Sequence, residues 1–236
     1  MLAKLFRKKQ SVSNCKVSIV IQPASVTVSV LSDQAPFVKQ LACPDQNYAK
    51  TIAELLIEQT VDGANCYVVL AHGMYQMTQI DKPNVPEVEY STALGFSAKD
   101  FFTISPENQL LDYYQNVSNV PNNNKLNVVA CDRNVVTPIL DVLKGLELTL
   151  VGISIEDIVL TNFVKDENAN LVIFHNPGSQ LLLGIIKNSE LCFSRRIHGY
   201  DNLHRLSEIG FEAGILSNLG LEVQRSIDYA IEIGRA

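Results

Sequence analysis

The 236-residue sequence predicts an α/β protein with two similar lobes, each a β-meander followed by a helix, and a small subdomain inserted between them. Residues 17–41 and 171–197 share one pattern of strand, tight turn, strand, polar turn and strand. In addition, Ile-Val-Ile-Gln-Pro-Ala-Ser at 19–25 aligns with Ile-Phe-His-Asn-Pro-Gly-Ser at 173–179. A repeat with so long a period indicates two lobes rather than a solenoid, although so short a match can also arise by chance.

The first lobe is expected over residues 14–80, after a basic tail at residues 1–13. Its second strand alternates valines with hydroxyl residues, which is typical of a half-exposed strand. A helix is expected over residues 47–60, because apolar side chains recur there at helical spacing and Asp62-Gly63 supplies a stop. The strands of this lobe are expected at residues 17–21, 25–31, 37–41, 66–70 and 74–80.

The inserted α/β subdomain is expected over residues 81–146, starting with a proline-rich connection. A helix with acidic residues in its first turn follows at residues 87–96. Asp132 is expected to cap a second helix that ends at Gly145. The remaining expectations are a helical turn from Ser105, a strand at 126–130, and a buried helix face made of Val136, Ile139, Leu140 and Leu143.

The second lobe is expected over residues 147–236 and contains the second meander. The last helix has apolar residues at three- and four-residue steps, so one of its faces is expected to be buried. That inner face includes Leu219, Val223, Ile227 and Ile231, and the outer face Glu222, Arg225, Ser226 and Asp228. Strands are expected at 148–153, 171–174, 180–187 and 190–197, with a hairpin turn at 187–189.

Composition narrows the possible functions. The net charge of −6 argues against a protein that coats nucleic acid, because such proteins are basic. Five scattered cysteines in mostly apolar runs indicate reduced core thiols and a reducing compartment. No run of the sequence approaches the roughly 20 apolar residues that a membrane-spanning helix needs, so a soluble chain is expected.

The basic tail combines cations with apolar side chains, which suits contact with an anionic membrane or a membrane partner. The alternative is a terminus that only increases solubility. The residues concerned are Lys4, Leu5, Phe6, Arg7, Lys8 and Lys9.

The paired turns at 22–25 and 175–179 are where folds of this kind present backbone N–H groups and hydroxyls to a phosphate. A carboxylate normally holds the accompanying metal ion. Here Pro23 and Pro177 each remove an N–H donor, and neither turn contains an acid. The sequence therefore predicts that phosphate chemistry has been lost from both turns.

Three sequence segments resemble those of a known family. They are the basic segment at residues 4–9, Pro-Asn-Val-Pro-Glu-Val-Glu at 83–89, and Leu-Glu-Val-Gln-Arg-Ser-Ile-Asp-Tyr at 221–229. Over essentially its whole length the chain resembles the PilM-like, actin-related proteins of type IV pilus and type II secretion machines. The resemblance implies an actin-like fold with ribonuclease H-like lobes, in which the 221–229 helix lies behind the nucleotide cleft. It also implies partners of one kind, short cytoplasmic segments of inner-membrane assembly proteins such as PilN, with assembly motor components as further candidates.

The sequence departs from ATP-binding relatives, which carry Asp-x-Gly and then small hydroxyl residues at both turns. We therefore expect no cofactor, no metal and no catalysis, and a second lobe that is incomplete at its C-terminus because the glycine-rich, adenine-contacting strand is missing. The expected function is a cytoplasmic scaffold peripheral to the inner membrane, of undetermined oligomeric state. The degenerate cleft turns comprise Gln22, Pro23, Ser25, His175, Pro177, Gly178 and Ser179.

Alternative functions and sites stay open at this point. An ATP-binding ATPase of the same machinery is the main rival, and a sugar-kinase-like enzyme would need a catalytic acid, for which Asp132 and Asp201 are nominal candidates. Arg195-Arg196 could form an anion site, but we expect a pair of solvated charges at an exposed strand end. The four histidines lack the spacing of metal ligands.

Overall fold

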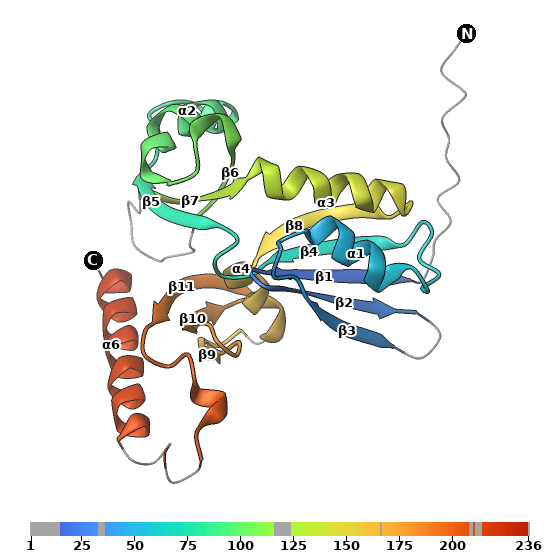
Figure 1. The fold of residues 1–236 in the computed structure, drawn as a ribbon. Coiled ribbons are helices and arrows are strands. Elements are labelled where there is room, and N and C mark those ends of the chain that lie inside the picture. The colour runs from blue at the N-terminus through green and yellow to red at the C-terminus, as the bar shows by residue number, and fades with distance from the viewer. Residues whose placement is uncertain are drawn as a thin grey trace. The chain divides into compact units, whose positions relative to one another are not determined.

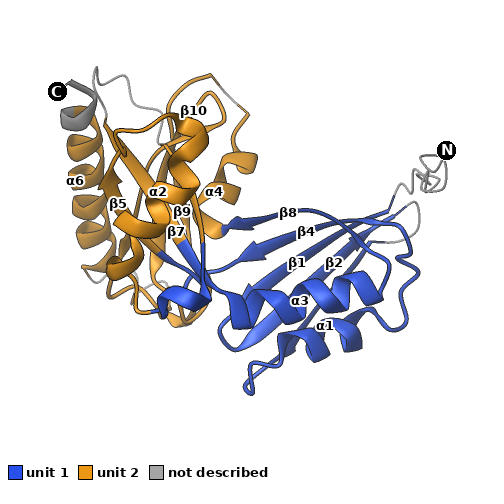
Figure 2. Ribbon diagram, turned by 90° about the horizontal axis from the view of Figure 1, so that it is seen from above, with its two compact units in different colours: residues 1–76, 104–110, 130–155 blue, residues 77–103, 111–129, 156–236 orange. Residues whose placement is uncertain are grey.

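The computed structural model describes residues 15–32, 36–115, 124–165, 167–207, 210 and 214–235 (Figure 1). The basic tail lies outside the described residues. The chain divides into two compact units, which are considered one at a time (Figure 2). Unit 1 comprises residues 1–76, 104–110 and 130–155, and unit 2 comprises residues 77–103, 111–129 and 156–236.

Unit 1 is built on a five-stranded sheet with the order β3-β2-β1-β4-β8. The first three strands form the predicted antiparallel meander, and β4 and β8 continue the sheet in parallel with β1. Alternate residues of β2 are buried, as the valine and hydroxyl alternation predicted, and alternate residues of β1 are completely buried. The strands are β1 Lys16–Gln22, β2 Ser25–Leu31, β3 Phe37–Ala42, β4 Asn65–Leu70 and β8 Thr149–Ile155.

Helices α1 (Tyr48–Leu56) and α3 (Arg133–Gly145) lie side by side on one face of this sheet, as Figure 2 shows. Asn47 caps α1 by accepting the N–H of Lys50, and α1 ends before the predicted boundary because residues 57–60 form a turn. The predicted cap of α3 is confirmed, since Asp132 accepts the N–H of Asn134 at 2.8 Å. Leu140 was expected in the buried face of α3, but it is 36% exposed.

The second predicted meander lies in unit 2 and forms an antiparallel sheet with the order β11-β10-β9. Asn188 and Ser189 both have positive φ angles, which is the conformation of a type I′ hairpin turn and confirms the predicted turn. Side chains of β10 point alternately into two apolar clusters, one with Leu160 and one with Leu219. The elements are α4 Glu156–Val159, η4 Leu160–Phe163, β9 Asn170–Phe174, β10 Leu181–Lys187, β11 Glu190–Ile197, η5 Leu203–Arg205 and α6 Ile215–Arg235.

A third sheet, with the order β5-β7-β6, lies in the central part of the chain. The expected helix at 87–96 consists of a 3₁₀ turn and then α2, whose buried residue is Leu94. The expected turn from Ser105 is also 3₁₀, and a strand follows it. The elements are β5 Gln76–Asp81, η1 Glu87–Glu89, α2 Tyr90–Ser97, η2 Lys99–Phe101, η3 Pro106–Asn108, β6 Gln109–Tyr114 and β7 Lys125–Asp132.

The buried face of α6 differs from the predicted one. Ser226, expected on the outer face, is completely buried, whereas Ile231, expected inside, is 44% exposed. Burial of Ser226 is tolerated because its hydroxyl donates to the carbonyl of Glu222 at 2.6 Å. The inner face therefore follows Leu219, Val223 and Ser226.

All five cysteines are free, but the prediction of core thiols is confirmed for only three of them, since Cys131 and Cys192 are half-buried. Cys15, Cys43 and Cys66 are buried, and burial raises the pKa of Cys66 to about 11.

Within the described part of the chain, no helix has both the length and the apolar character to cross a membrane.

We predict that Leu219→Ala lowers the free energy of unfolding by about 2 to 5 kcal/mol, because it leaves a cavity beneath α6. Leu221→Ala is the matched control on the same helix, where the side chain is 57% exposed, and it should cost less than about 0.5 kcal/mol. Urea denaturation followed by circular dichroism measures both. Equal losses in the two variants would contradict the observed orientation of α6.

Candidate functional site

The first candidate turn joins β1 to β2, and its polar groups bond to one another. The Ser25 hydroxyl donates to Oε1 of Gln22 at 2.8 Å. Gln40 on β3 donates its side-chain amide to the same oxygen at 2.8 Å and to Oγ of Ser25 at 3.0 Å. The Ser25 hydroxyl and the side-chain oxygen of Gln22 are therefore both engaged within the protein.

Pro23 is held closely at the tip of this turn. The Tyr48 hydroxyl donates to its carbonyl at 3.1 Å. Gly73 packs against its ring, and a Cβ at position 73 would lie 2.8 Å from Cγ of Pro23. Gly73 also has a φ of +90°, so both conformation and space require glycine there.

The second candidate turn joins β9 to β10, and it directs its N–H donors into the protein. Gly178 donates its N–H to the carbonyl of Asp201 at 3.1 Å. Both the N–H and the hydroxyl of Ser179 donate to the carbonyl of Asn176 at 2.9 Å. Pro177 has no N–H, so three successive residues of this turn offer no backbone donor to an outside anion.

His175 lies beside this turn. Its Nε2 is 3.2 Å from the carbonyl of Asp201, and its ring stacks on that of His204 with centroids 5.8 Å apart. Among the described residues, no three histidine, cysteine or acidic side chains are grouped so that they could hold a metal ion. Of the nominal acid candidates, Asp132 caps α3 with its carboxylate, and Asp201 accepts the N–H of Gly178 through its backbone carbonyl.

A buried charged cluster lies next to the second turn, and sequence reasoning missed it. Arg196 on β11 contacts Oε2 of Glu156 at 3.2 Å and Oδ2 of Asp157 at 2.8 Å. All three side chains are at least 87% buried. Asn176 of the turn donates to Oε1 of Glu156 at 3.4 Å, so the cluster reaches the turn directly. The expectation of a solvated Arg196 was therefore wrong.

Tyr114 on β6 extends this cluster. Burial raises the pKa of its hydroxyl, and the nearby carboxylate of Asp157 raises that pKa further. One sequence signal could have indicated the cluster: Glu156-Asp157 follows directly on the apolar strand at 149–155. Acidic residues that are themselves buried need a cationic partner, which here lies forty residues away.

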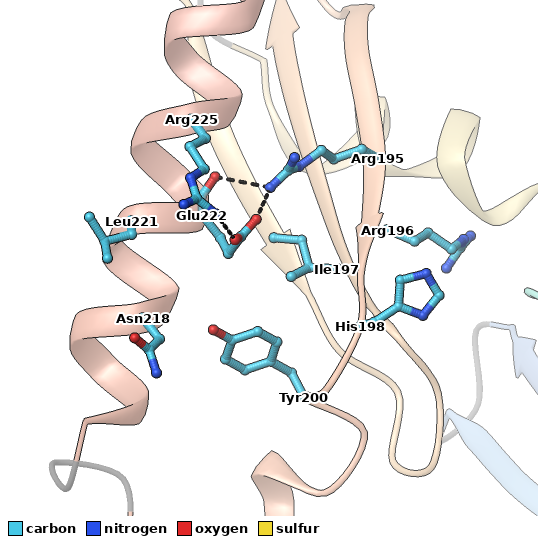
Figure 3. A pocket seen from close by; sticks show the side chains of 9 residues that line it. All are labelled: Arg195, Arg196, Ile197, His198, Tyr200, Asn218, Leu221, Glu222 and Arg225. Carbon is cyan, nitrogen blue, oxygen red and sulfur yellow. Dashed lines mark hydrogen bonds and ion pairs between the residues drawn. The ribbon is translucent and has the colours of Figure 1, made fainter.

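Figure 3 shows a groove between β11 and α6, with a cavity volume of about 460 Å³. Glu222 of α6 lies between two guanidinium groups: Arg195 of β11 bonds to its carboxylate, and Arg225 contacts the same carboxylate at 2.8 Å. Tyr200 points toward α6, whereas Arg196 and His198 extend away from it. Arg195 is therefore part of an ion-pair network rather than a solvated charge.

The two turns and the groove do not form one described site. The first turn belongs to unit 1, and the second turn, the charged cluster and the groove belong to unit 2. The proposed membrane or partner residues of the tail lie outside the described residues.

We predict that Arg196→Met lowers the free energy of unfolding by about 3 to 5 kcal/mol, because two buried carboxylates lose their cation. Arg225→Met is the matched control, since its ion pair is 68% exposed on the arginine side and should be worth about 0 to 1 kcal/mol. Thermal and urea unfolding of both variants measure the difference. A loss below about 1 kcal/mol in Arg196→Met would mean that the buried cluster does not stabilise unit 2.

No family model and no curated protein matches the sequence. The structure, however, is similar to solved ones. One is the cytoplasmic domain of EpsL, an inner membrane component of the type II secretion system of Vibrio cholerae, at 16% identity and a TM-score of 0.55. That likeness covers 78% of this chain and 71% of the EpsL chain.

A second similar structure is a PilM–PilN type IV pilus biogenesis complex, at 17% identity and a TM-score of 0.53. The likeness covers 93% of this chain and 72% of that one. At such identities the similarity concerns the fold alone. It confirms the predicted α/β, actin-like fold.

Proposed function

We propose that this protein is a non-catalytic cytoplasmic scaffold of the inner-membrane platform that assembles a type IV pilus. The observation that carries the proposal is the internal bonding of both turns. Ser25, Gly178 and Ser179 all donate to groups of the protein itself. A phosphate would have to displace these bonds, which makes the turns poor anion sites.

The assembly role is supported by the printed descriptions of the two similar structures, one an inner membrane secretion component and the other a pilus biogenesis complex. The sequence resemblance points more narrowly to the MSHA-type pilus and its protein MshI. The proposed partner is a PilN-like cytoplasmic segment of an inner-membrane assembly protein, and assembly motor components are further candidates. We propose the domain organisation that the sequence indicates, with the basic tail at residues 1–13, the two lobes at residues 14–80 and 147–236, and the inserted subdomain at residues 81–146.

The main alternative is an ATP-binding ATPase of the same machinery. The groove between β11 and α6 supports this alternative, because it is large enough for a ligand and contains polar side chains (Figure 3). Arg195 and Arg225, however, both bond to Glu222, so its charges are engaged within the protein. We therefore place the ATPase second.

We predict that isothermal titration of the full chain with ATP and Mg²⁺ shows no binding with a dissociation constant below about 1 mM. Any binding free energy is then weaker than about 4 kcal/mol. Magnesium-dependent binding in the micromolar range, abolished in Ser179→Ala but kept in Ser97→Ala, would overturn the scaffold proposal. Ser97 is a suitable control because it is an exposed serine of α2 in the same unit.

A second prediction concerns the tail. Lys8→Gln with Lys9→Gln should weaken binding to vesicles rich in phosphatidylglycerol by about 30-fold, at about 1 kcal/mol for each cation. The control is Lys144→Gln with Lys187→Gln, which removes two exposed cations elsewhere. Vesicle co-sedimentation measures both. Equal affinities of the two variants would leave the tail without a role at the membrane.

A further inference from the structure

The sheet of unit 1 ends in a strand whose outer edge is open. Among the strands that the structure describes, β8 pairs only with β4, so it is the last strand on its side of the sheet (Figure 2). Its backbone groups that point away from β4 therefore have no described strand beside them, which is the arrangement that lets an extended chain add to a sheet. Five successive residues of β8, at 149–153, are exposed.

The composition of β8 does not protect this edge. Its seven residues include no charge and no proline, whereas β3, at the opposite edge of the same sheet, contains Lys39. A charged side chain on an edge strand hinders pairing with another chain. The exposed side chains of β8 are aliphatic instead, so its edge favours such pairing. They are Leu150, Val151 and Ile153, which are 37%, 53% and 38% exposed.

An apolar groove accompanies the edge. It has a cavity volume of about 460 Å³ and lies between the C-terminal part of α3 and the start of β8. Four leucines line it, and two of them, Leu140 and Leu150, are 36% and 37% exposed. Alternate side chains of a strand share one face of a sheet, so those of an added strand can enter the groove. The four are Leu140, Leu143, Leu148 and Leu150.

An acidic side chain lies at one end of this groove. Glu147 lines it and has a φ of +54°, at the position after α3 where glycine is the usual residue. Its backbone is fixed there, because its N–H donates to the carbonyl of Lys144 at 3.1 Å and its carbonyl accepts the N–H of Gly63 at 3.0 Å. The helix dipole also disfavours an acid at a helix C-terminus. Glu147 thus violates two local preferences, which is typical of residues with a role in recognition.

We propose that β8 and this groove accept an extended segment of another protein as an additional strand. The segment has aliphatic side chains at alternate positions and a lysine or arginine at the end that meets Glu147. Its backbone bonds to the outer edge of β8, and its aliphatic side chains pack against the four leucines. Its cation pairs with Glu147, which forms no ion pair among the described residues. This inference rests on the scaffold role proposed above, since it gives the scaffold a site for a partner.

A second copy of this chain fits the edge less well. The pairing of β8 with β4 shifts register around Val151, which is therefore the extra residue of a β-bulge. Bulges bend a strand and hinder the direct pairing of two identical edges. A second β8 also contains no cation for Glu147. The occupant is therefore a different chain.

Peptide binding to the full chain tests the proposal. The probes are the blocked peptide Lys-Val-Thr-Val-Thr-Val and the same sequence reversed, because an added strand can be parallel or antiparallel to β8. Each carries fluorescein at the end remote from its lysine, and fluorescence anisotropy measures the affinity. We expect at least one of them to bind with a dissociation constant below about 1 mM. Amide hydrogen exchange should then slow at residues 149–153 and stay unchanged at residues 37–42.

The groove is tested with Leu150→Thr, which should weaken peptide binding about fivefold because it removes apolar contact area. The matched control is Leu31→Thr, since Leu31 is also an exposed leucine of a strand in unit 1 and should leave the affinity unchanged. Threonine is a good strand residue, so both variants should fold, and thermal unfolding verifies this.

The acidic end of the groove is tested with Glu147→Gln. This variant should weaken binding of the lysine peptide about threefold, as expected for one exposed ion pair. It should not change binding of a peptide in which glutamine replaces the lysine. Asp141→Asn, which neutralises another exposed acid of the same unit, is the control and should have no effect on either peptide.

The proposal is wrong if neither peptide binds at about 1 mM, or if exchange slows on β3 rather than on β8. Equal affinities of Leu150→Thr and Leu31→Thr would also contradict it. So would dimerisation of the chain alone, seen by sedimentation and lost in Leu150→Thr, because the edge would then be occupied by a second copy. The ATP titration tests the scaffold role separately. Failure of both peptides without any ATP binding would therefore remove this docking site but not the proposed function.

Discussion

The contact of Arg196 with Glu156 and Asp157 is the constraint on which much of unit 2 depends. Two carboxylates are removed from water there, and the free energy of that burial is recovered only if a cation and hydrogen bonds remain in place. The contact fixes β11 relative to α4, and Asn176 connects it to the turn between β9 and β10. The backbone of the second turn is thus anchored on one side by a charged group and on the other by the carbonyl of Asp201.

That anchoring determines which backbone donors of the second turn are left for a ligand. A turn that binds an anion leaves its N–H groups pointing outward, where they are satisfied by the ligand or by water. In this protein the two available donors, Gly178 and Ser179, bond inside unit 2, and Pro177 contributes none. In unit 1, Gln22 and Gln40 hold Ser25 in a similar way. The polar groups of both turns therefore stabilise the units to which they belong.

Local signals in the sequence predicted most elements. Asp132 before an amphipathic stretch indicated a capped helix, and the alternation around Val28 indicated a strand with one buried face; the structure confirms both. The misses have two causes. Ser226 can be buried because its hydroxyl donates to the carbonyl of Glu222 in the same helix, a local bond that the apolar periodicity does not reveal. Arg196 is buried against two acids of another element, and that pairing arises only when β11 and α4 meet in the fold.

Exposed apolar groups occur both in the meanders and in the central segment of the chain. Alternate residues of β10 are buried in two clusters, but Val38 of β3 is 68% exposed and Ile173 of β9 is 43% exposed. In the central segment, Val88, Phe96 and Phe101 are 62 to 89% exposed within one short stretch. Exposed apolar side chains that lie so close together in the sequence are candidates for contact with another molecule. A partner surface on this protein is therefore better sought among these residues than in the buried clusters on the two faces of β10.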